Sequence, residues 1–284
     1  MTENVMQSEA PSVDRTPSAA RALRLRRQHL RRAMEHALTG ILSAEEIDVH
    51  FSYMPDRYWS RANEETVQRH LLVVHRFLGR LTAPDSDGTT PFMAWRQLPD
   101  RDVTEVEICS WDRLGLLANV AGASAAAELS IVRADVYTRV DNVVLDVFQV
   151  CDADGHRVHD EAKLHLMDAL LTAALRPDAS PAPLRDWEAD DSSPVKRASP
   201  QVGFDTERDD AYTALILEAD DRIGLLRDVL AALTDCRVNV THAIITTDGG
   251  RAGDVLYLTD ADGSKIASPA RLEHIRDSLL RALD

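Results

Sequence analysis

The chain has 284 residues, of which 44% are hydrophobic, and a formal net charge of −15. This length predicts two or three small domains, each large enough to bury a core of its own. The acidic balance argues against a nucleic-acid-binding protein, because the phosphates of a duplex would repel most of such a surface. No apolar stretch is long enough to span a membrane, and the first residues show no signal or transit sequence, so we expect a cytoplasmic protein.

The N-terminal third is predicted to be helical. Residues 1–18 lack apolar periodicity and should form a disordered tail, whereas residues 19–100 show helical spacing and are interpreted as a helical region that ends in a linker from Asp85 toward Asp100. The signals, in chain order, are an apolar stripe, a capping box and a capping asparagine: Leu23, Leu30, Met34, Ala37 and Ile41, then Ser43 with Glu46, then Asn63. The histidines, including His70 and His75, are placed near polar helix faces, and the arginine run of the first helix indicates a solvated face.

The pattern changes to alternating strands in residues 101–176. Val103–Ile108 alternates like a half-buried strand, Gly115–Glu128 reads as a helix, and Ile131–Tyr137 and Val143–Val150 read as two further strands. A second helix ends at Pro177. The order β-α-β-β-α is the beginning of a ferredoxin-like β-α-β-β-α-β unit. Residues 177–199 are rich in Pro, Ser, Asp and Ala and are predicted to be a linker.

The same pattern returns in residues 207–284, so the chain contains an internal repeat. Asp112-Arg113-Leu114-Gly115-Leu116-Leu117 is answered by Asp221-Arg222-Ile223-Gly224-Leu225-Leu226, each between a predicted strand and a predicted helix. Each copy also carries Asp-Ala-Asp-Gly, interpreted as a surface turn and not as a metal site. A duplicated unit creates a pseudo-symmetric seam, and such seams are common places for small ligands to bind.

Neither copy has a closing strand directly after its second helix. The one spare strand-like piece, Gln201–Asp205 within residues 200–206, is predicted to close the sheet of one copy. Because an unpaired sheet edge invites association, the other edge is expected to be covered by a neighbouring copy or a second protomer.

The two repeated loops are the candidate ligand sites, with these residues: Asp112, Arg113, Leu114, Gly115, Leu116, Asp221, Arg222, Ile223, Gly224, Leu225 and Asn239. A glycine entering a helix allows close approach to backbone N–H groups that can bind a carboxylate, and the aspartate can accept an ammonium group. The alternative is that both aspartates are ordinary N-caps and that both arginines pair with acidic neighbours. The second loop is favoured because Asn239 is replaced by Ser130 in the first copy.

No cofactor or metal site is expected. Cys109, Cys151 and Cys236 show no metal-ligand spacing and are interpreted as buried packing residues. The pair His159-Asp160 stands without the further ligands that a phosphohydrolase metal site requires.

The strand, Asp-Arg-x-Gly-Leu-Leu, helix, and following Val238-Asn239-Val240 resemble the ACT domain, a regulatory module that commonly binds amino acids. The tandem copies, the Asp-Ala-Asp-Gly turns and Met54-Pro55-Asp56-Arg57-Tyr58 resemble the C-terminal part of bacterial PII uridylyltransferase/uridylyl-removing enzymes, from about Ala20 onward. The resemblance implies an α+β fold of two ferredoxin-like βαββαβ ACT domains preceded by an α-helical region. That family senses glutamine and modifies the PII signal protein through separate catalytic domains, whose motifs we do not find here.

Three functions remain open from the sequence. The first is a non-catalytic regulatory protein of nitrogen metabolism that binds an amino acid, with glutamine as first choice, and signals to a PII-type or other protein as a homo-oligomer. The second is a shortened PII uridylyltransferase relative that works with a separate catalytic chain. The third is a ligand-free ACT module that only dimerises.

Overall fold

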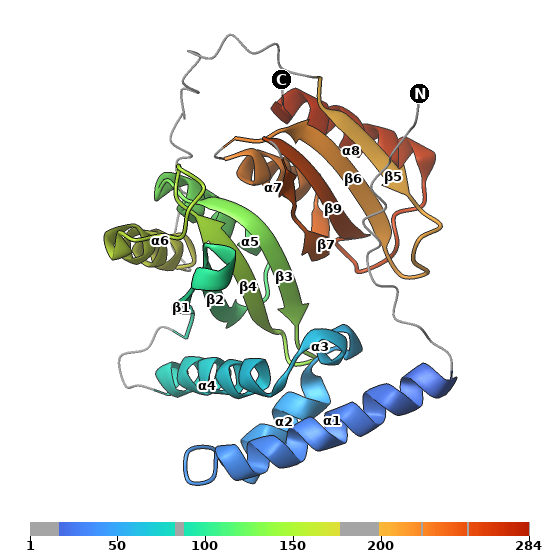
Figure 1. The fold of residues 1–284 in the computed structure, drawn as a ribbon. Helices are drawn as coiled ribbons and strands as arrows, with labels where there is room; N and C mark the ends of the chain where they lie inside the picture. The colour runs from blue at the N-terminus through green and yellow to red at the C-terminus, as the bar shows by residue number, and fades with distance from the viewer. Residues whose placement is uncertain (1–16, 83–87, 177–198, 223, 249, 284) are drawn as a thin grey trace.

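The computed structural model describes residues 17–82, 88–176, 199–222, 224–248 and 250–283. The expectations for the tail before residue 17, for residues 177–198 of the linker and for Ile223 lie outside these described residues. A helical region lies beneath two α/β units, which stand side by side (Figure 1). Within the described residues, no helix combines the length and the apolar character needed to cross a membrane.

Four helices form the N-terminal region: α1 (Pro17–Ala37), α2 (Ala44–Tyr53), α3 (Asp56–Arg61) and α4 (Glu64–Leu81). Both predicted caps are confirmed. The Glu46 amide donates to Ser43 Oγ at 3.2 Å while the Ser43 amide donates to the Glu46 carboxylate at 2.8 Å, and Asn63 Oδ1 accepts from the Thr66 amide at 2.8 Å. Ile41 was assigned to the apolar stripe but is 57% exposed, because α1 ends at Ala37 before reaching it.

An aromatic cluster forms the centre of the helical region. Trp59 of α3 is 0% exposed and its ring stacks on Phe51 of α2 with 4.4 Å between ring centroids. The placement of His70 on a polar helix face was wrong. His70 is 2% exposed, its Nδ1 lies 3.0 Å from the Tyr58 hydroxyl, and its Nε2 lies 3.0 Å from a Glu107 oxygen. The helical region is thereby attached to the neighbouring sheet through buried polar contacts.

The first α/β unit contains β1 (Phe92–Leu98), a 3-10 turn (Pro99–Arg101), β2 (Val103–Trp111), α5 (Leu116–Ala126), β3 (Ser130–Thr138), β4 (Val143–Cys151) and α6 (Glu161–Ala174). The sheet order is β1-β2-β4-β3. One face of this sheet carries α5 and α6. The other face joins the core of the helical region, to which it contributes Phe92, Cys109, Tyr137, Val143 and Leu145.

Strand β1 corrects two sequence-based expectations. It lies inside the predicted helical region of residues 19–100, and it pairs antiparallel with β2 from Phe92 opposite Cys109 to Leu98 opposite Val103. The edge of this sheet is therefore covered by the chain's own preceding strand, not by a neighbouring copy or a second protomer. The hairpin closes through Asp102, whose φ of 52° gives the left-handed bend that brings the two strands together.

The second α/β unit contains β5 (Gln201–Asp205), β6 (Thr213–Asp220), α7 (Leu225–Asp235), β7 (Val238–Ile244), β8 (Thr247–Asp248), β9 (Arg251–Asp260) and α8 (Pro269–Leu283). Its sheet order is β5-β6-β9-β7, with β8 beside β9. Gln201–Asp205 is antiparallel to β6 and covers the edge of this sheet. Apart from the two-residue strand β8, each unit therefore runs β-β-α-β-β-α. In each unit the edge strand occupies the position of the closing strand of a ferredoxin-like unit. In the chain, however, it comes before the other strands of its unit and not after the second helix.

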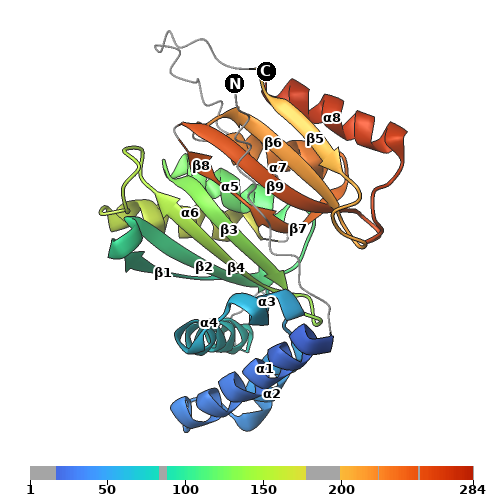
Figure 2. The ribbon, with the colours of Figure 1, turned by 45° about the vertical axis from the view of Figure 1, so that its right-hand side comes forward.

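The two units share one hydrophobic core. Leu116 and Val120 of α5 belong to the same buried cluster as Leu230 and Leu233 of α7. At the seam, β3 and β7 lie side by side, as do α5 and α7 (Figure 2). The repeat therefore folds as a pseudo-symmetric pair with a single layer of helices behind both sheets.

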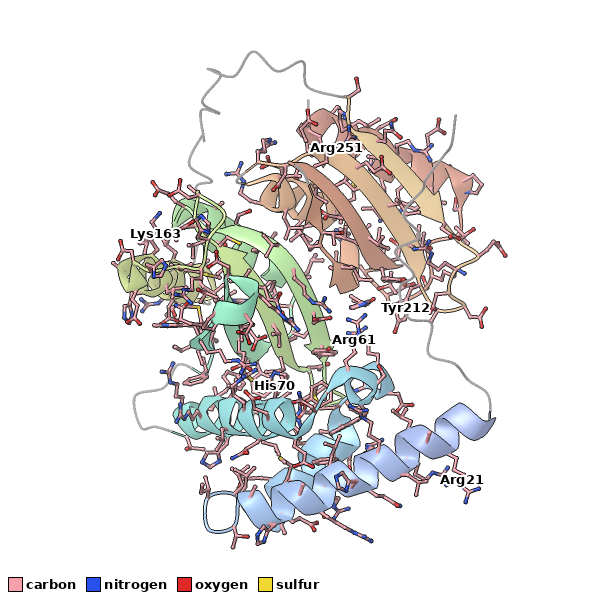
Figure 3. All side chains as sticks on the ribbon, in the orientation of Figure 1. Arg21, Arg61, His70, Lys163, Tyr212 and Arg251 are labelled. Carbon is pink, nitrogen blue, oxygen red and sulfur yellow. The ribbon has the colours of Figure 1, made fainter. Side chains whose placement is uncertain are left out.

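Arg57 of α3 joins all three parts of the molecule. Its guanidinium donates to the carbonyl oxygens of Val136 in β3 and Thr241 in β7, the latter at 2.7 Å, and lies 5.5 Å from the centre of the Tyr137 ring. One turn further on, Arg61 pairs with Asp135 of β3 at 2.5 Å, at the junction of α3 and the sheets (Figure 3). The short helix α3 therefore stabilises the seam between the two repeats through contacts to β3 and β7.

The aromatic cluster gives a stability prediction. Replacing Trp59 with alanine removes a fully buried side chain, so the free energy of unfolding should fall by about 3 to 5 kcal/mol. Ile41→Ala is the control, because this 57% exposed side chain should contribute less than about 0.5 kcal/mol. Urea unfolding followed by circular dichroism measures both, and equal losses in the two variants would contradict the packing described.

Candidate functional site

Both repeated loops bend at a glycine in the left-handed region. Gly115 has φ 79° and Gly224 has φ 86°, and each is the N-cap of its helix without a side-chain capping bond. The alternative that Asp112 and Asp221 are the N-caps is therefore wrong. Both loops are anchored alike, since the Asp112 amide donates to a carbonyl of the β3–β4 hairpin at 2.7 Å and the Asp221 amide donates to a carbonyl of the β8–β9 hairpin at 2.9 Å.

The first loop opens onto a cleft of about 490 Å³ at the seam. The walls come from all three parts of the molecule: the helical region supplies Pro55 and Arg57, the first unit supplies residues 112–118, and the second unit supplies residues 238–241 with Leu230 and Thr234. The remaining lining residues are Val136, Thr138, Asn142, Val144, Asp146, Tyr212, Thr259 and Gly263. A cleft of this size is within the usual range for small-molecule sites.

The predicted residues of the first loop, Asp112 to Leu116, all line this cleft, and Asn239 lies on the same cleft. Asn239 was assigned to the second loop because the two belong to the same copy. In the structure, each loop faces the strand that begins the other unit's second hairpin. Asn239 therefore completes the first loop, and its equivalent Ser130 lies near the second.

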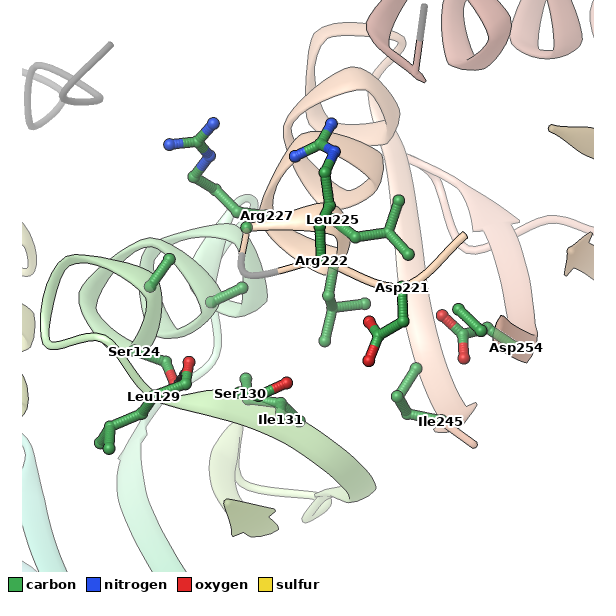
Figure 4. A pocket seen from close by; sticks show the side chains of 15 residues that line it. Ser124, Leu129, Ser130, Ile131, Asp221, Arg222, Leu225, Arg227, Ile245 and Asp254 are labelled. Atoms are coloured by element: carbon green, nitrogen blue, oxygen red, sulfur yellow. Dashed lines mark hydrogen bonds between the residues drawn. The ribbon is translucent and has the colours of Figure 1, made fainter. Parts of the chain in front are cut away.

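The second loop has much less room. Its hollow measures about 20 Å³ and is lined by Asp221, Arg222, Gly224 and Leu225, together with Ser130 and neighbours from the first unit (Figure 4). Such a volume holds about one water molecule. The space available therefore does not support the preference for the second loop over the first.

Arg222 of the second loop and Arg227 of α7 lie beside Gly224. Arg222 and Arg227 both pair with Asp228, each at 2.6 Å. A Cβ atom at Gly224 would lie 3.7 Å from the guanidinium carbon of Arg227. For Arg222, the pairing with an acidic neighbour is the alternative that the structure realises.

Asp146 of β4 is among the cleft residues that the sequence analysis missed. It is 0% exposed, and its Oδ1 accepts from the Tyr137 amide at 3.3 Å. Its Oδ2 is buried and has no hydrogen-bond partner among the described residues. Burial raises the pKa of Asp146 to about 8; the nearby Asp112 carboxylate adds to the rise, and Arg57 opposes it. At neutral pH, Asp146 is therefore mainly a neutral carboxylic acid.

The second copy repeats this acidic pair. Asp254 of β9 is buried, and its Oδ1 accepts from the Thr246 amide at 3.2 Å. Burial raises the pKa of Asp254 to about 7, and Asp221 adds to the rise. The repeat of Asp146 as Asp254 was visible in the sequence, but a single aspartate within an apolar strand does not reveal whether it lies beside a cavity.

The Asp-Ala-Asp-Gly segments form surface turns. Asp152 Oδ1 accepts from the amides of Asp154 and His156, both at 3.0 Å, and Asp262 Oδ1 accepts from the Ser264 amide at 2.9 Å. Three or more His, Cys, Asp or Glu side chains placed to hold a metal ion do not occur within the described residues. All three cysteines are buried and free, as expected for packing residues.

Residues 209–282 match the family model described as the ACR family N-terminal ACT domain. The second unit is an ACT domain. The first unit repeats its strand order, its glycine loop and its Asp-Ala-Asp-Gly turn, so the chain carries two ferredoxin-like ACT domains behind a helical region.

Curated relatives extend the resemblance over most of the chain. The bifunctional uridylyltransferase/uridylyl-removing enzyme of Gluconobacter oxydans is 34% identical over 260 residues, which is 90% of this chain and 27% of that enzyme. The enzymes of the same name from Azospirillum brasilense and Rhodospirillum rubrum are 33% and 30% identical over 88% and 84% of this chain, and 27% and 24% of their own lengths. The chain thus spans about a quarter of these relatives, and the predicted resemblance to the PII uridylyltransferase family is confirmed. The chain is an ACT-domain regulatory region related to these enzymes.

Asp146 gives a pH-dependent stability prediction. Its folded pKa of about 8 lies above the usual value, so the folded chain binds a proton that the unfolded chain loses near pH 4. The stability of the wild type therefore falls, relative to Asp146→Asn, as the pH rises from 4 to 8, by up to about 1.4 kcal/mol per pH unit, and the difference is constant above pH 8.

Urea unfolding at several pH values measures this difference. Asp154→Asn in the exposed turn is the control and should follow the wild type at every pH. Parallel stability curves for the wild type and Asp146→Asn would contradict the raised pKa of Asp146.

Proposed function

We propose that this chain is a non-catalytic regulatory region that binds a free amino acid, with glutamine as first choice, in the cleft at the first loop. The observation that carries the proposal is the composition of the cleft, because both ACT domains and the helical region contribute to its walls. A ligand bound in this cleft would contact both ACT domains and the helical region, and these are the parts whose relative positions it would control.

The first loop complements the backbone end of an amino acid. Helix α5 begins at Gly115 without a side-chain cap, and Leu117 and Ala118 of its first turn line the cleft. Amide groups in a first helical turn have no intrahelical partners and attract a carboxylate. Asp112 lies on the same cleft and supplies the negative charge for an ammonium group.

The opposite wall suits a side-chain amide. Asn239, Thr241 and Thr259 line the cleft from the second ACT domain. The Asn239 side-chain nitrogen donates to the Asp260 carbonyl at 3.5 Å and Thr241 Oγ1 donates to the Tyr257 carbonyl at 3.0 Å, so both side-chain oxygens retain acceptor capacity. An amide side chain both donates and accepts, which is why glutamine is our first choice.

Binding at the seam gives a route to signalling. A ligand can shift the orientation of the two ACT domains only by its differential affinity for the two states. Arg57 lines the cleft and is bonded to both domains, so such a shift would also move the helical region. We propose that a PII-type signal protein or another protein in a cytoplasmic nitrogen-control pathway reads this change, with the chain acting as a homo-oligomer.

A second candidate function rests on the names of the relatives. The enzymes that share up to 34% identity with this chain are called uridylyltransferase/uridylyl-removing enzymes. The chain would then be the glutamine-responsive part of such an activity and would work with a separate catalytic chain. Nucleotide transfer to PII by the purified chain alone would favour catalysis over both proposals.

A thermal-shift screen of the twenty amino acids tests the proposed function. A ligand of the folded state at about one hundred times its dissociation constant adds about 2.7 kcal/mol of stability, which is a shift of several degrees. We expect the largest shift with glutamine. No shift with any amino acid would favour the ligand-free dimerisation module.

The strand residue opposite the first loop gives a binding prediction. Asn239→Ala should weaken the affinity for glutamine about tenfold, because one hydrogen bond to the ligand is lost. Ser130→Ala is the matched control at the equivalent position beside the small hollow, and its affinity should equal that of the wild type. Calorimetric titration measures both, and a loss in Ser130→Ala alone would move the site to the second loop.

A further inference from the structure

The cleft contains a buried carboxyl group whose second oxygen lacks a partner. Asp146 Oδ2 is shielded from solvent and makes no hydrogen bond within the described residues. Buried polar atoms in folded proteins are almost always paired, and an unpaired one costs free energy. An unpaired oxygen in the wall of a cleft therefore indicates a ligand that donates to it.

The described groups around Asp146 leave its Oδ2 atom unpaired and favour a positively charged ligand beside it. Among the described residues, the charged or titratable groups facing it are Asp112 from the β2–α5 loop, Arg57 from α3 and Cys109 from β2, and β3 supplies the Tyr137 amide. Arg57 donates through its Nη2 atom to the carbonyl groups of Val136 in β3 and Thr241 in β7 instead. A cation placed between two carboxyl groups favours the ionised form of both.

We propose that Asp112 and Asp146 together receive the α-ammonium group of the bound amino acid, and that binding releases the proton that Asp146 carries in the free protein. This rests on the proposed function of the cleft and adds to it the orientation of the ligand. The ammonium group lies at the acidic pair, the carboxylate at the start of α5, and the side chain points to the second ACT domain.

The proton balance is simple. Free Asp146 is a neutral acid at pH 7, because burial raises its pKa to about 8. An ammonium group at hydrogen-bond distance favours the ionised form and lowers that pKa. The O–H bond of Asp146 breaks, the carboxylate forms an ion pair with the unchanged ammonium group, and one proton goes to the solvent.

The second ACT domain provides an internal control. Asp254 and Asp221 repeat the acidic pair, and Asp254 holds the Thr246 amide as Asp146 holds the Tyr137 amide. The shared bond to the backbone accounts for a structural role in both copies. The difference is the space beside the pair, about 490 Å³ in the first domain and about 20 Å³ in the second.

Calorimetric titration of the full chain with L-glutamine, in two buffers of different ionisation enthalpy, measures the proton release. Near pH 7 we expect about one proton released for each glutamine bound, and between pH 6 and 8 an association constant that rises by up to about tenfold per pH unit. Glutaramate, which is glutamine without its amino group, should bind at least about tenfold more weakly and release no proton. If another amino acid stabilises the chain better, it is used with its own des-amino analogue.

Two matched variants decide the assignment. Asp146→Asn keeps the acceptor for Tyr137 and should bind glutamine at least about tenfold more weakly, without proton release and without the pH dependence. Asp254→Asn should retain both at the wild-type level. Glutamine binding without proton release, or equal effects of the two variants, overturns the ammonium assignment alone. No binding by any amino acid overturns the proposed function as well.

Discussion

The guanidinium group of Arg57 is the contact on which the arrangement of the three parts depends. Where β3 and β7 meet, each strand has carbonyl groups at its edge. The Arg57 guanidinium donates to one carbonyl group of each strand, those of Val136 and Thr241. Unpaired buried carbonyl groups would destabilise the seam. Both bonds leave the Nη2 atom of Arg57, so one permanently charged group satisfies a carbonyl of each strand.

This contact also breaks the symmetry of the repeat. The two ACT domains create two equivalent positions along their seam, one beside each glycine loop. The helical region supplies Pro55 and Arg57 to only one of these positions. That position is the roomy cleft, whereas the other is closed against the arginine pair around Asp228. The duplicated fold thus has one site with room for a ligand. The difference between the two positions comes from the helical region, which is not part of the repeat.

Local signals in the sequence predicted the local structure well. The capping box at Ser43, the cap at Asn63, the glycine bends and the strand pattern after Val103 all depend on neighbouring residues, and the structure contains each of them. Strand β1 was missed because its pairing depends on a left-handed residue at Asp102, which carries no glycine signal. His70 was misplaced because its partners Tyr58 and Glu107 come from different parts of the chain.

The candidate site shows the same limit more clearly. The sequence identified both loops and Asn239, but it joined Asn239 to the loop of its own copy. Side-by-side packing of β3 against β7 exchanges the partners, so that each loop is completed by the other domain. A ligand at the first loop therefore cannot contact both Asp112 and Asn239 unless the two domains hold this orientation. Binding energy from both walls is available only in that orientation, and this is the condition under which an amino acid can control the arrangement of the domains.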